Sequence, residues 1–180
     1  MHKLVPSNSE ILNKPLETFD FSNPPEDPKK IAEILLEHVK EYKGIGLSAN
    51  QIGLPYRVFI LVGNPSMVCF NPRIVSSGNN VILTEEGCLT FPGLYVRIKR
   101  PEEVRVRYVD ENGETQTRQL TGLTSRCFQH ELDHLDGIDY TKRASKYHLD
   151  QAKRKMKYFK RKLKDFDLSP RKMYEGAYAE

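Results

Sequence analysis

The amino-acid sequence predicts an α+β fold, in which mixed and antiparallel sheets pack around a central helix and a basic helix follows toward the C-terminus. Three segments carry apolar residues at helical spacing, and several short β-branched or aromatic runs lie between the first and the second of them. This order favours α+β over an alternating βαβ arrangement. A chain of 180 residues has the size expected of one domain.

The first helix is predicted to begin at Pro28, a residue that suits the first helical turn, with Asp27 as its N-cap. Gly44 is expected to end it. The apolar positions that recur with helical spacing are Ile31, Leu35, Val39 and Tyr42.

The middle of the chain is predicted to be rich in strands. Residues 57–84 contain the runs RVFILVG, MVCF, RIV and VILT, which are broken by Asn-Pro and Gly-Asn. Two further runs, VRVRYVD and TQTRQL, flank Asn112-Gly113, which is a strong signal for a tight hairpin.

Two more helices are predicted after the strands. The segment LTSRCFQHELDHL follows Gly122 and is expected to end at Gly137. The last helix is expected from about Lys146 to Phe166, so we divide the chain into a body (1–145) and a basic helix with its tail (146–180). Its apolar stripe, expected to pack on the body, consists of Leu149, Ala152, Met156, Phe159, Leu163 and Phe166.

The charge of the chain is unevenly distributed. Residues 1–141 carry 15 Lys and Arg against 19 Asp and Glu, whereas residues 142–164 carry 11 against one. An acidic body with a basic segment predicts that this segment meets an anionic partner, although a solvated basic face is the alternative.

The composition is that of a soluble globular protein, with 38% hydrophobic and 29% charged residues. The N-terminal residues lack the apolar core of a signal peptide, and the longest apolar run, VFILVG, is too short to cross a membrane. Three cysteines do not form a disulfide framework in a chain of this size. We therefore expect a cytoplasmic protein that makes no use of a membrane.

One motif indicates metal chemistry. His130, Glu131 and His134 form an HExxH pattern, and residues at i and i+4 of a helix lie one above the other, so both imidazoles can reach one divalent ion. Glu131 lies beside this ion without binding it and is placed as a general base. Tyr140 stands where a longer form of the motif has a third histidine, so the third ligand must come from elsewhere.

The cysteines are the candidates for this third ligand. Cys127 is excluded because seven helical residues, about 10.5 Å of rise, separate it from His134. Cys69 lies among apolar residues and is expected in the core. Cys88 follows a predicted strand in EEGCLTFPG, and spacing alone favours it without deciding the matter.

Three stretches resemble the three motifs of the peptide deformylases: GIGLSANQ (44–51), EGCLT (86–90) and QHELDH (129–134). The likeness extends from about Leu4 to Tyr140. It implies a metal-dependent hydrolase that removes the formyl group from the N-terminal formylmethionine of nascent polypeptides and releases formate. Two positions depart from the family pattern, because Ser48 stands where alanine is usual and Thr90 where serine is usual.

The resemblance also implies roles for individual residues. Cys88, His130 and His134 are expected to bind one divalent ion, most commonly Fe2+, with Zn2+, Ni2+ or Co2+ as substitutes. Glu131 is expected to be the acid and base. Gln51, through its amide, and Leu89, through its backbone N–H, are expected to stabilise the oxyanion.

Substrate contacts are implied in the same way. The segment Gly44, Ile45 and Gly46 is expected to pair with the peptide as an added strand. An apolar pocket for the methionine side chain is expected from Ile45, Leu123, Cys127 and the edge of His130.

A second set of residues is expected around the site. Glu86 is expected to contribute to substrate binding and to form an ion pair with Arg100, with a plain surface pair as the alternative. Asp133 is expected to orient a ligand. Arg97 and Arg100 are expected near the mouth of the site.

Two functional classes compete with this interpretation. A zinc endopeptidase of the HExxH type is the other enzyme, and a binding module with a vestigial metal site is the alternative outside catalysis. In bacterial relatives of the resembled family a C-terminal helix docks on the ribosome, so the basic helix predicts a ribosomal partner.

Overall fold

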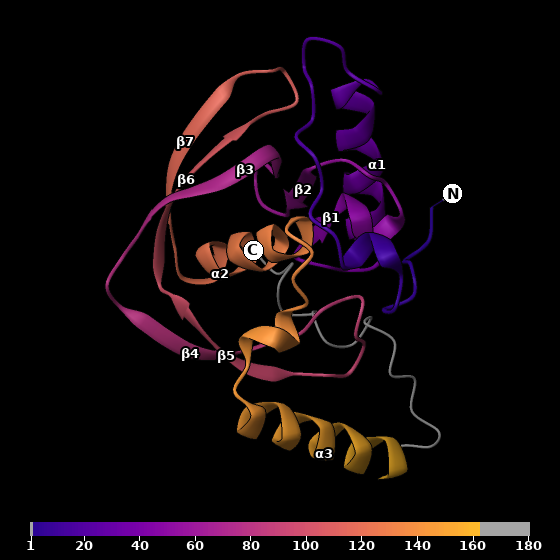
Figure 1. Cartoon of the computed structure of the whole chain (residues 1–180), viewed down its shortest axis with the longest axis vertical. Coiled ribbons are helices and arrows are strands. Elements are labelled where there is room, and N and C mark those ends of the chain that lie inside the picture. Colours follow the sequence, from indigo (N-terminus) through magenta and orange to yellow (C-terminus); the bar gives the residue numbers. More distant parts are fainter. Residues whose placement is uncertain (1, 163–180) are drawn as a thin grey trace.

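The structure is a computed structural model that describes residues 2–162, and it confirms the α+β prediction (Figure 1). Helices and strands alternate irregularly along the chain rather than as βαβ units. Their bounds are α1 (Pro28–Glu41), β1 (Gly46–Ser48), β2 (Val58–Leu61), β3 (Met67–Ser77), β4 (Val81–Glu86), β5 (Val96–Pro101), β6 (Glu103–Val109), β7 (Thr115–Thr121), α2 (Gly122–Leu135) and α3 (Lys146–Lys162). Short 3-10 helices cover Glu10–Leu12, Ala49–Ile52 and Tyr140–Arg143.

Helix α1 begins as predicted. The side chain of Asp27 accepts a hydrogen bond from the backbone N–H of Lys29, and Pro28 occupies the first turn. Ile31, Leu35 and Val39 are fully buried in the core that α1 shares with β1 and β2. The helix therefore fixes the position of the chain that enters β1.

The larger sheet has five antiparallel strands in the order β1-β2-β3-β6-β7. The predicted runs MVCF and RIV belong to one long strand, β3, because a register shift between Phe70 and Arg73 accommodates Asn71 and Pro72. The hairpin between β6 and β7 turns at Asn112-Gly113, as predicted, with Gly113 at φ 82°.

Strands β4 and β5 form a separate two-stranded sheet, and β5 was missed by the sequence prediction. Its inward residues are Val96, Ile98 and Arg100. The apolar alternation is interrupted by a buried arginine, so the run VRIKRP does not have the pattern of an amphipathic strand. This strand brings Arg100 to the functional site.

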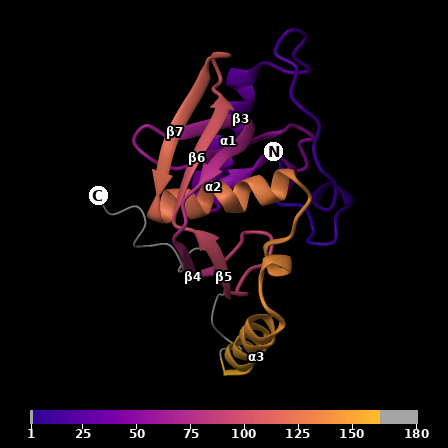
Figure 2. The same cartoon turned by 60° about the vertical axis from the view of Figure 1, so that its left-hand side comes forward.

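Helix α2 lies between the two sheets and crosses the larger one (Figure 2). It packs against β1, β2 and β7 on one side and against β5 on the other, which buries most of its residues. Phe128 stacks edge-on against Phe59 of β2 with ring centroids 5.0 Å apart. Several of these buried residues are polar or charged, including Gln129, Glu131 and Asp133.

Helix α3 lies beyond β5, on the side away from the larger sheet (Figure 1). Leu149, Ala152 and Met156 pack on a cluster that contains Ile98 and Tyr140, as the apolar stripe predicted. Phe159 is 44% exposed, and the predicted extension to Phe166 lies outside the described residues. The division of the chain at residues 145 and 146 stays a prediction.

Among residues 2–162 there is no helix with the length and apolar character needed to span a bilayer.

Candidate metal centre and active site

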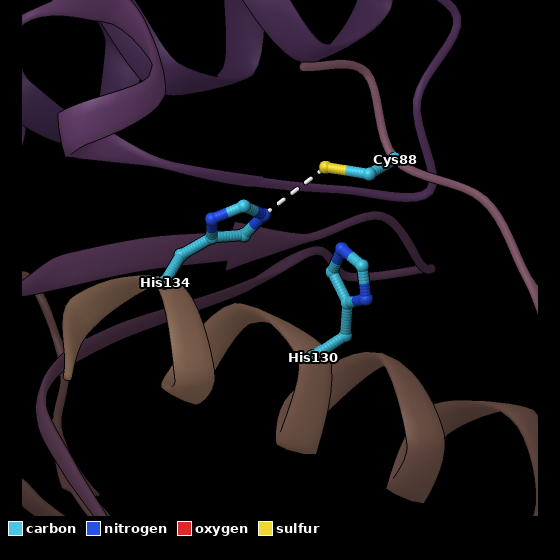
Figure 3. A group of neighbouring side chains, drawn as sticks. All are labelled: Cys88, His130 and His134. Carbon is cyan, nitrogen blue, oxygen red and sulfur yellow. Dashed lines mark hydrogen bonds between the residues drawn. The ribbon is translucent and has the colours of Figure 1, made fainter. Parts of the chain in front are cut away.

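Cys88, His130 and His134 come together although they are distant in sequence (Figure 3). Cys88 lies in the turn that follows β4, and the two histidines project from adjacent turns of α2. One potential ligand atom of each residue lies within 4.8 Å of the other two, and the sulfur of Cys88 is 3.1 Å from Nε2 of His134. All three side chains are buried, and Cys127 is not part of the group.

The electrostatics of this group favour a thiolate. Burial alone would raise the pKa of Cys88, but His134 and His130 outweigh it and hold the pKa well below the usual value of 9.0. One thiolate and two imidazoles within reach of one another are a donor set typical of a catalytic metal site with an open coordination position. The residues present therefore fit a divalent ion.

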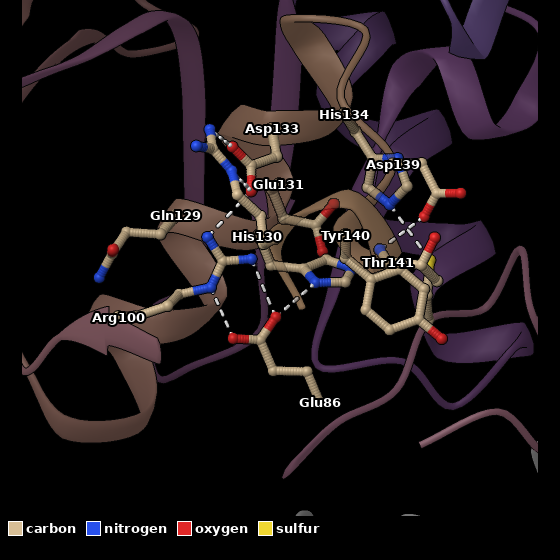
Figure 4. A network of polar contacts seen from close by, with 12 residues as sticks. Glu86, Arg100, Gln129, His130, Glu131, Asp133, His134, Asp139, Tyr140 and Thr141 are labelled. Carbon is tan, nitrogen blue, oxygen red and sulfur yellow. Dashed lines mark hydrogen bonds and ion pairs between the residues drawn. The ribbon is translucent and has the colours of Figure 1, made fainter. Parts of the chain in front are cut away.

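A buried ionic network orients His130 (Figure 4). Its Nδ1 lies 3.1 Å from Oε2 of Glu86, and its other ring nitrogen points toward Cys88 (Figure 3). Arg100 donates through Nε and Nη2 to the two oxygens of Glu86 and through Nη1 to Asp133. Burial opposes ionisation of Glu86, but His130 and Arg100 outweigh this effect and lower its pKa to about 2.

Two expectations about Arg100 are therefore corrected. Its side chain is 5% exposed and that of Glu86 is 8% exposed, so the alternative of a plain surface pair is wrong. The expectation that Arg100 lies near the mouth of the site is also wrong, because its guanidinium is held between two buried carboxylates. Asp133 does not contact the histidines directly; it holds Arg100 and is held in turn by Arg143.

The side chain of Glu131 extends from α2 toward strand β1. Its Oε2 accepts a hydrogen bond of 2.6 Å from the hydroxyl of Ser48. Its Oε1 lies against Gly46, where an added Cβ would be only 2.7 Å away, so any larger residue at this position would displace the carboxylate. Burial raises the pKa of Glu131, although His130, His134 and Ser48 oppose the rise.

Gln51 has a fixed amide orientation. Its Oε1 accepts a hydrogen bond from the backbone N–H of Ser48, so its Nε2 faces Thr90 at 3.1 Å and the sulfur of Cys88 at 3.5 Å. Leu89 follows Cys88 directly, and within residues 2–162 its backbone N–H has no acceptor. Both residues line the same cavity, and both groups are donors close to the cysteine.

A cavity of about 250 Å³ opens over these groups. Of the residues predicted in or around the site, His134, Arg97, Arg100 and Asp133 do not line it. The residues that do are Gly44, Ile45, Gly46, Gln51, Glu86, Cys88, Leu89, Leu123, Cys127, His130 and Glu131.

The sequence analysis assigned no role to four other residues that line the cavity, which are Glu85, Gly87, Tyr95 and Arg126. Tyr95 precedes the missed strand β5, so nothing placed it. Arg126 lies one turn before His130 on α2, and the i, i+4 spacing would have found it. Burial raises the pKa of Cys127 to about 12, so its thiol stays protonated beside the cavity.

Comparisons with known proteins agree with this geometry. The family model for polypeptide deformylase matches residues 1–150. The chain belongs to this family. A peptide deformylase of Thermotoga neapolitana is 40% identical over 126 residues, which cover 69% of this chain and 74% of that protein. One of Rhizobium meliloti is 35% identical over 150 residues, which cover 80% and 83%.

Solved structures show the same relationship. A peptide deformylase of Synechococcus elongatus in complex with actinonin superposes with a TM-score of 0.79 at 31% identity, covering 87% of this chain and 86% of that one. A plant peptide deformylase gives a TM-score of 0.79 at 30% identity and covers 91% of each chain. These relatives support the deformylase interpretation and not the zinc endopeptidase that HExxH alone allowed.

Proposed function

We propose that this protein hydrolyses the N-formyl group of formylmethionyl peptides and releases formate. The observation that carries the proposal is the convergence of Cys88, His130 and His134 beside the Glu131 carboxylate at the base of a cavity. The family assignment supports the same activity.

Cys88, His130 and His134 hold one divalent ion in this proposal. Such an ion lowers the pKa of a bound water and so supplies a nucleophile near neutral pH. We propose Fe2+ as the native ion, with Zn2+, Ni2+ or Co2+ as substitutes, because a thiolate suits a soft, oxidisable site. Glu86 fixes the ring orientation of His130 through Nδ1, and such a partner makes the imidazole a stronger ligand.

The remaining catalytic work falls to three groups. Glu131 lines the cavity and is placed to accept a proton from water and to return one to the departing amine. Gln51 and the backbone N–H of Leu89 donate toward the carbonyl oxygen as charge develops on it. One such donor typically lowers the barrier by about 3–4 kcal/mol.

The walls of the cavity suit a methionine at the N-terminus of the substrate. Ile45, Leu123 and Cys127 give it an apolar side that a thioether can fill without a large desolvation cost. Strand β1 lies at one end of the five-stranded sheet, so a peptide bound along Gly44 and Gly46 extends that sheet by one strand.

The test measures formate release from a formyl-Met peptide by anaerobically metallated protein, alongside cleavage of an unblocked peptide. Glu131→Gln is expected to lower kcat by about 10²–10⁴-fold. Glu85→Gln is the control, because this carboxylate also lines the cavity but has a side chain 47% exposed. A Glu131→Gln protein that turns over at the parent rate would contradict the proposal, and actinonin is the expected inhibitor.

We further propose that the protein acts on nascent chains in the cytoplasm and that α3 contacts ribosomal RNA. All three cysteines are free, as in a reducing compartment. The lysines at 153 and 157 are exposed, and Leu149, Ala152 and Met156 pack toward β5, so α3 presents positive charge outward beside the exposed rings of Tyr147, Tyr158 and Phe159.

Truncation at residue 146 would uncover the cluster around Ile98 and Tyr140, so charge reversal is the cleaner test. Lys153→Glu with Lys157→Glu is expected to abolish co-sedimentation with ribosomes at low salt and to spare activity on a short peptide. Lys29→Glu with Lys40→Glu changes two exposed lysines on α1 and is the matched control. Equal co-sedimentation of both double variants would rule out α3 as the docking surface.

A further inference from the structure

Ser48 is a fully buried serine at the end of β1, and it lies directly against Glu131 although 83 positions separate the two residues in sequence. Its hydroxyl lies 2.6 Å from Oε2 of Glu131 and 3.1 Å from the backbone oxygen of the same residue. A hydroxyl has one proton to donate, and 2.6 Å is the length typical of a hydrogen bond to an ionised carboxylate. The carboxylate is therefore the principal acceptor.

The conformational freedom of the Glu131 side chain depends on the Ser48 hydroxyl. Within the described residues, no other group donates a hydrogen bond to the Glu131 side chain. Glu131 has three side-chain torsions, and a long side chain with one oxygen unheld has several rotamers open to it. The contact with Ser48 removes that freedom at one oxygen.

The second oxygen is placed by the same strand. Gly46 and Ser48 are two residues apart on β1 and so face the same side, toward α2. Oε1 of Glu131 lies against Gly46, which lines the cavity, whereas Ser48 does not line it. Oε2 of Glu131 is thus held by Ser48 outside the lining of the cavity, and Oε1 lies at the cavity beside Gly46.

We propose that Ser48 is a positioning residue, whose hydroxyl fixes Oε2 of Glu131 so that Oε1 is presented to the reacting groups. Ser48 touches neither the cavity nor the three metal-site residues, and its hydroxyl reaches the reacting groups through Glu131. Its other contacts are with Gln51, whose side-chain oxygen accepts from the Ser48 backbone N–H and whose backbone N–H faces the Ser48 side chain. The expected effect of Ser48 on the rate of formate release rests on the proposed function, whereas its effect on the position of the Glu131 carboxylate does not.

The test compares Ser48→Ala with the parent protein, both anaerobically loaded with Fe2+ and normalised to bound metal. Alanine is usual at this place in the family, so the variant is expected to fold. We expect kcat for formate release to fall about tenfold, because a small displacement of a general base has a large effect on rate. KM is expected to change by less than twofold, because Ser48 does not line the cavity.

Ser125→Ala is the matched control. Ser125 is also fully buried, lies on α2, and accepts a hydrogen bond from Gln129 at 3.0 Å. Loss of this hydroxyl affects packing and stability in a similar way but leaves Glu131 untouched, so kcat is expected to stay within twofold of the parent. A merely structural role for Ser48 would make the two variants behave alike.

Crystal structures of the metallated parent and Ser48→Ala proteins give a readout that does not depend on turnover. We expect the Glu131 carboxylate of the variant to leave its parent position or to occupy more than one rotamer. A parent-like carboxylate in the variant overturns the proposal, whatever the rate. A displaced carboxylate with a kcat within twofold of the parent, or an equal loss in Ser125→Ala, overturns it as well.

The two proposals fail in different ways. A metallated parent that releases no formate would refute the proposed function. The position of Glu131 in the two crystal structures would still decide whether Ser48 holds it.

Discussion

Replacement of Arg100 by methionine tests the buried network behind His130 most severely. Methionine keeps much of the length of the arginine stem but removes every donor, so the carboxylates of Glu86 and Asp133 lose their shared partner. The free energy of unfolding is expected to fall, and its dependence on pH is expected to become weaker.

The magnitude follows from burial. The side chains of Arg100, Glu86 and Asp133 are 5%, 8% and 7% exposed, and breaking a buried pair by removing one partner typically costs about 3–5 kcal/mol. Arg143 still pairs with Asp133, which limits most of the loss to Glu86. We therefore expect the free energy of unfolding at pH 7 to fall by about 3 kcal/mol.

The dependence on pH provides an independent check. The pKa of Glu86 is lowered from 4.5 to about 2, so its ionised form stabilises the fold above the unfolded pKa, and this stabilisation is lost as the pH falls toward 2. The shift corresponds to roughly 3 kcal/mol. The parent protein is expected to lose this stability between about pH 5 and pH 2, and Arg100→Met to lose much less of it.

The assay is urea unfolding of metal-depleted parent and variant at a series of pH values. Lys155→Met is the control, because its ion pair with Glu85 has side chains 60% and 47% exposed and contributes at most about 1 kcal/mol. If Arg100→Met and Lys155→Met lost the same small amount, the network would not have the energetic role assigned to it.

Two further outcomes are expected. Gly46→Ala places a methyl group 2.7 Å from Oε1 of Glu131 and should lower kcat about 100-fold. Gly78→Ala is the control, because its nearest contact is 3.3 Å and kcat should not change. Equal rates for the two variants would contradict the close packing of Glu131 on Gly46. Cys127, with a pKa of about 12, should react with iodoacetamide at pH 7.5 at least about 100-fold more slowly than a free thiol, as followed by mass spectrometry. Rapid alkylation would show that the pKa of this thiol is not raised.

The parts of the fold that the sequence predicted are those with a strong local signal. The cap at Asp27, the hairpin at Asn112-Gly113 and the apolar stripe of α3 each depend on residues that are neighbours along the chain. Strand β5 was missed because Arg100 occupies an inward position that an apolar residue usually fills. Glu86, the ion-pair partner of Arg100, lies on β4.

The site shows the same division. The i, i+4 spacing of His130 and His134 predicted that they share one face of a helix, but spacing alone did not decide for Cys88, and the resemblance was needed. The contact between Ser48 and Glu131 joins residues 83 positions apart. Such a contact depends on how β1 meets α2, and no local pattern encodes it.

The central claim is that one sulfur and two imidazole nitrogens hold a single ion, and X-ray absorption at the iron edge tests it most directly. Protein loaded anaerobically with Fe2+ is expected to show one sulfur at about 2.3 Å and two nitrogens at about 2.1 Å, by analogy with other divalent ions in such ligand sets. The sulfur is expected to disappear from the spectrum of Cys88→Ser. An iron site without sulfur in the parent protein would contradict the account.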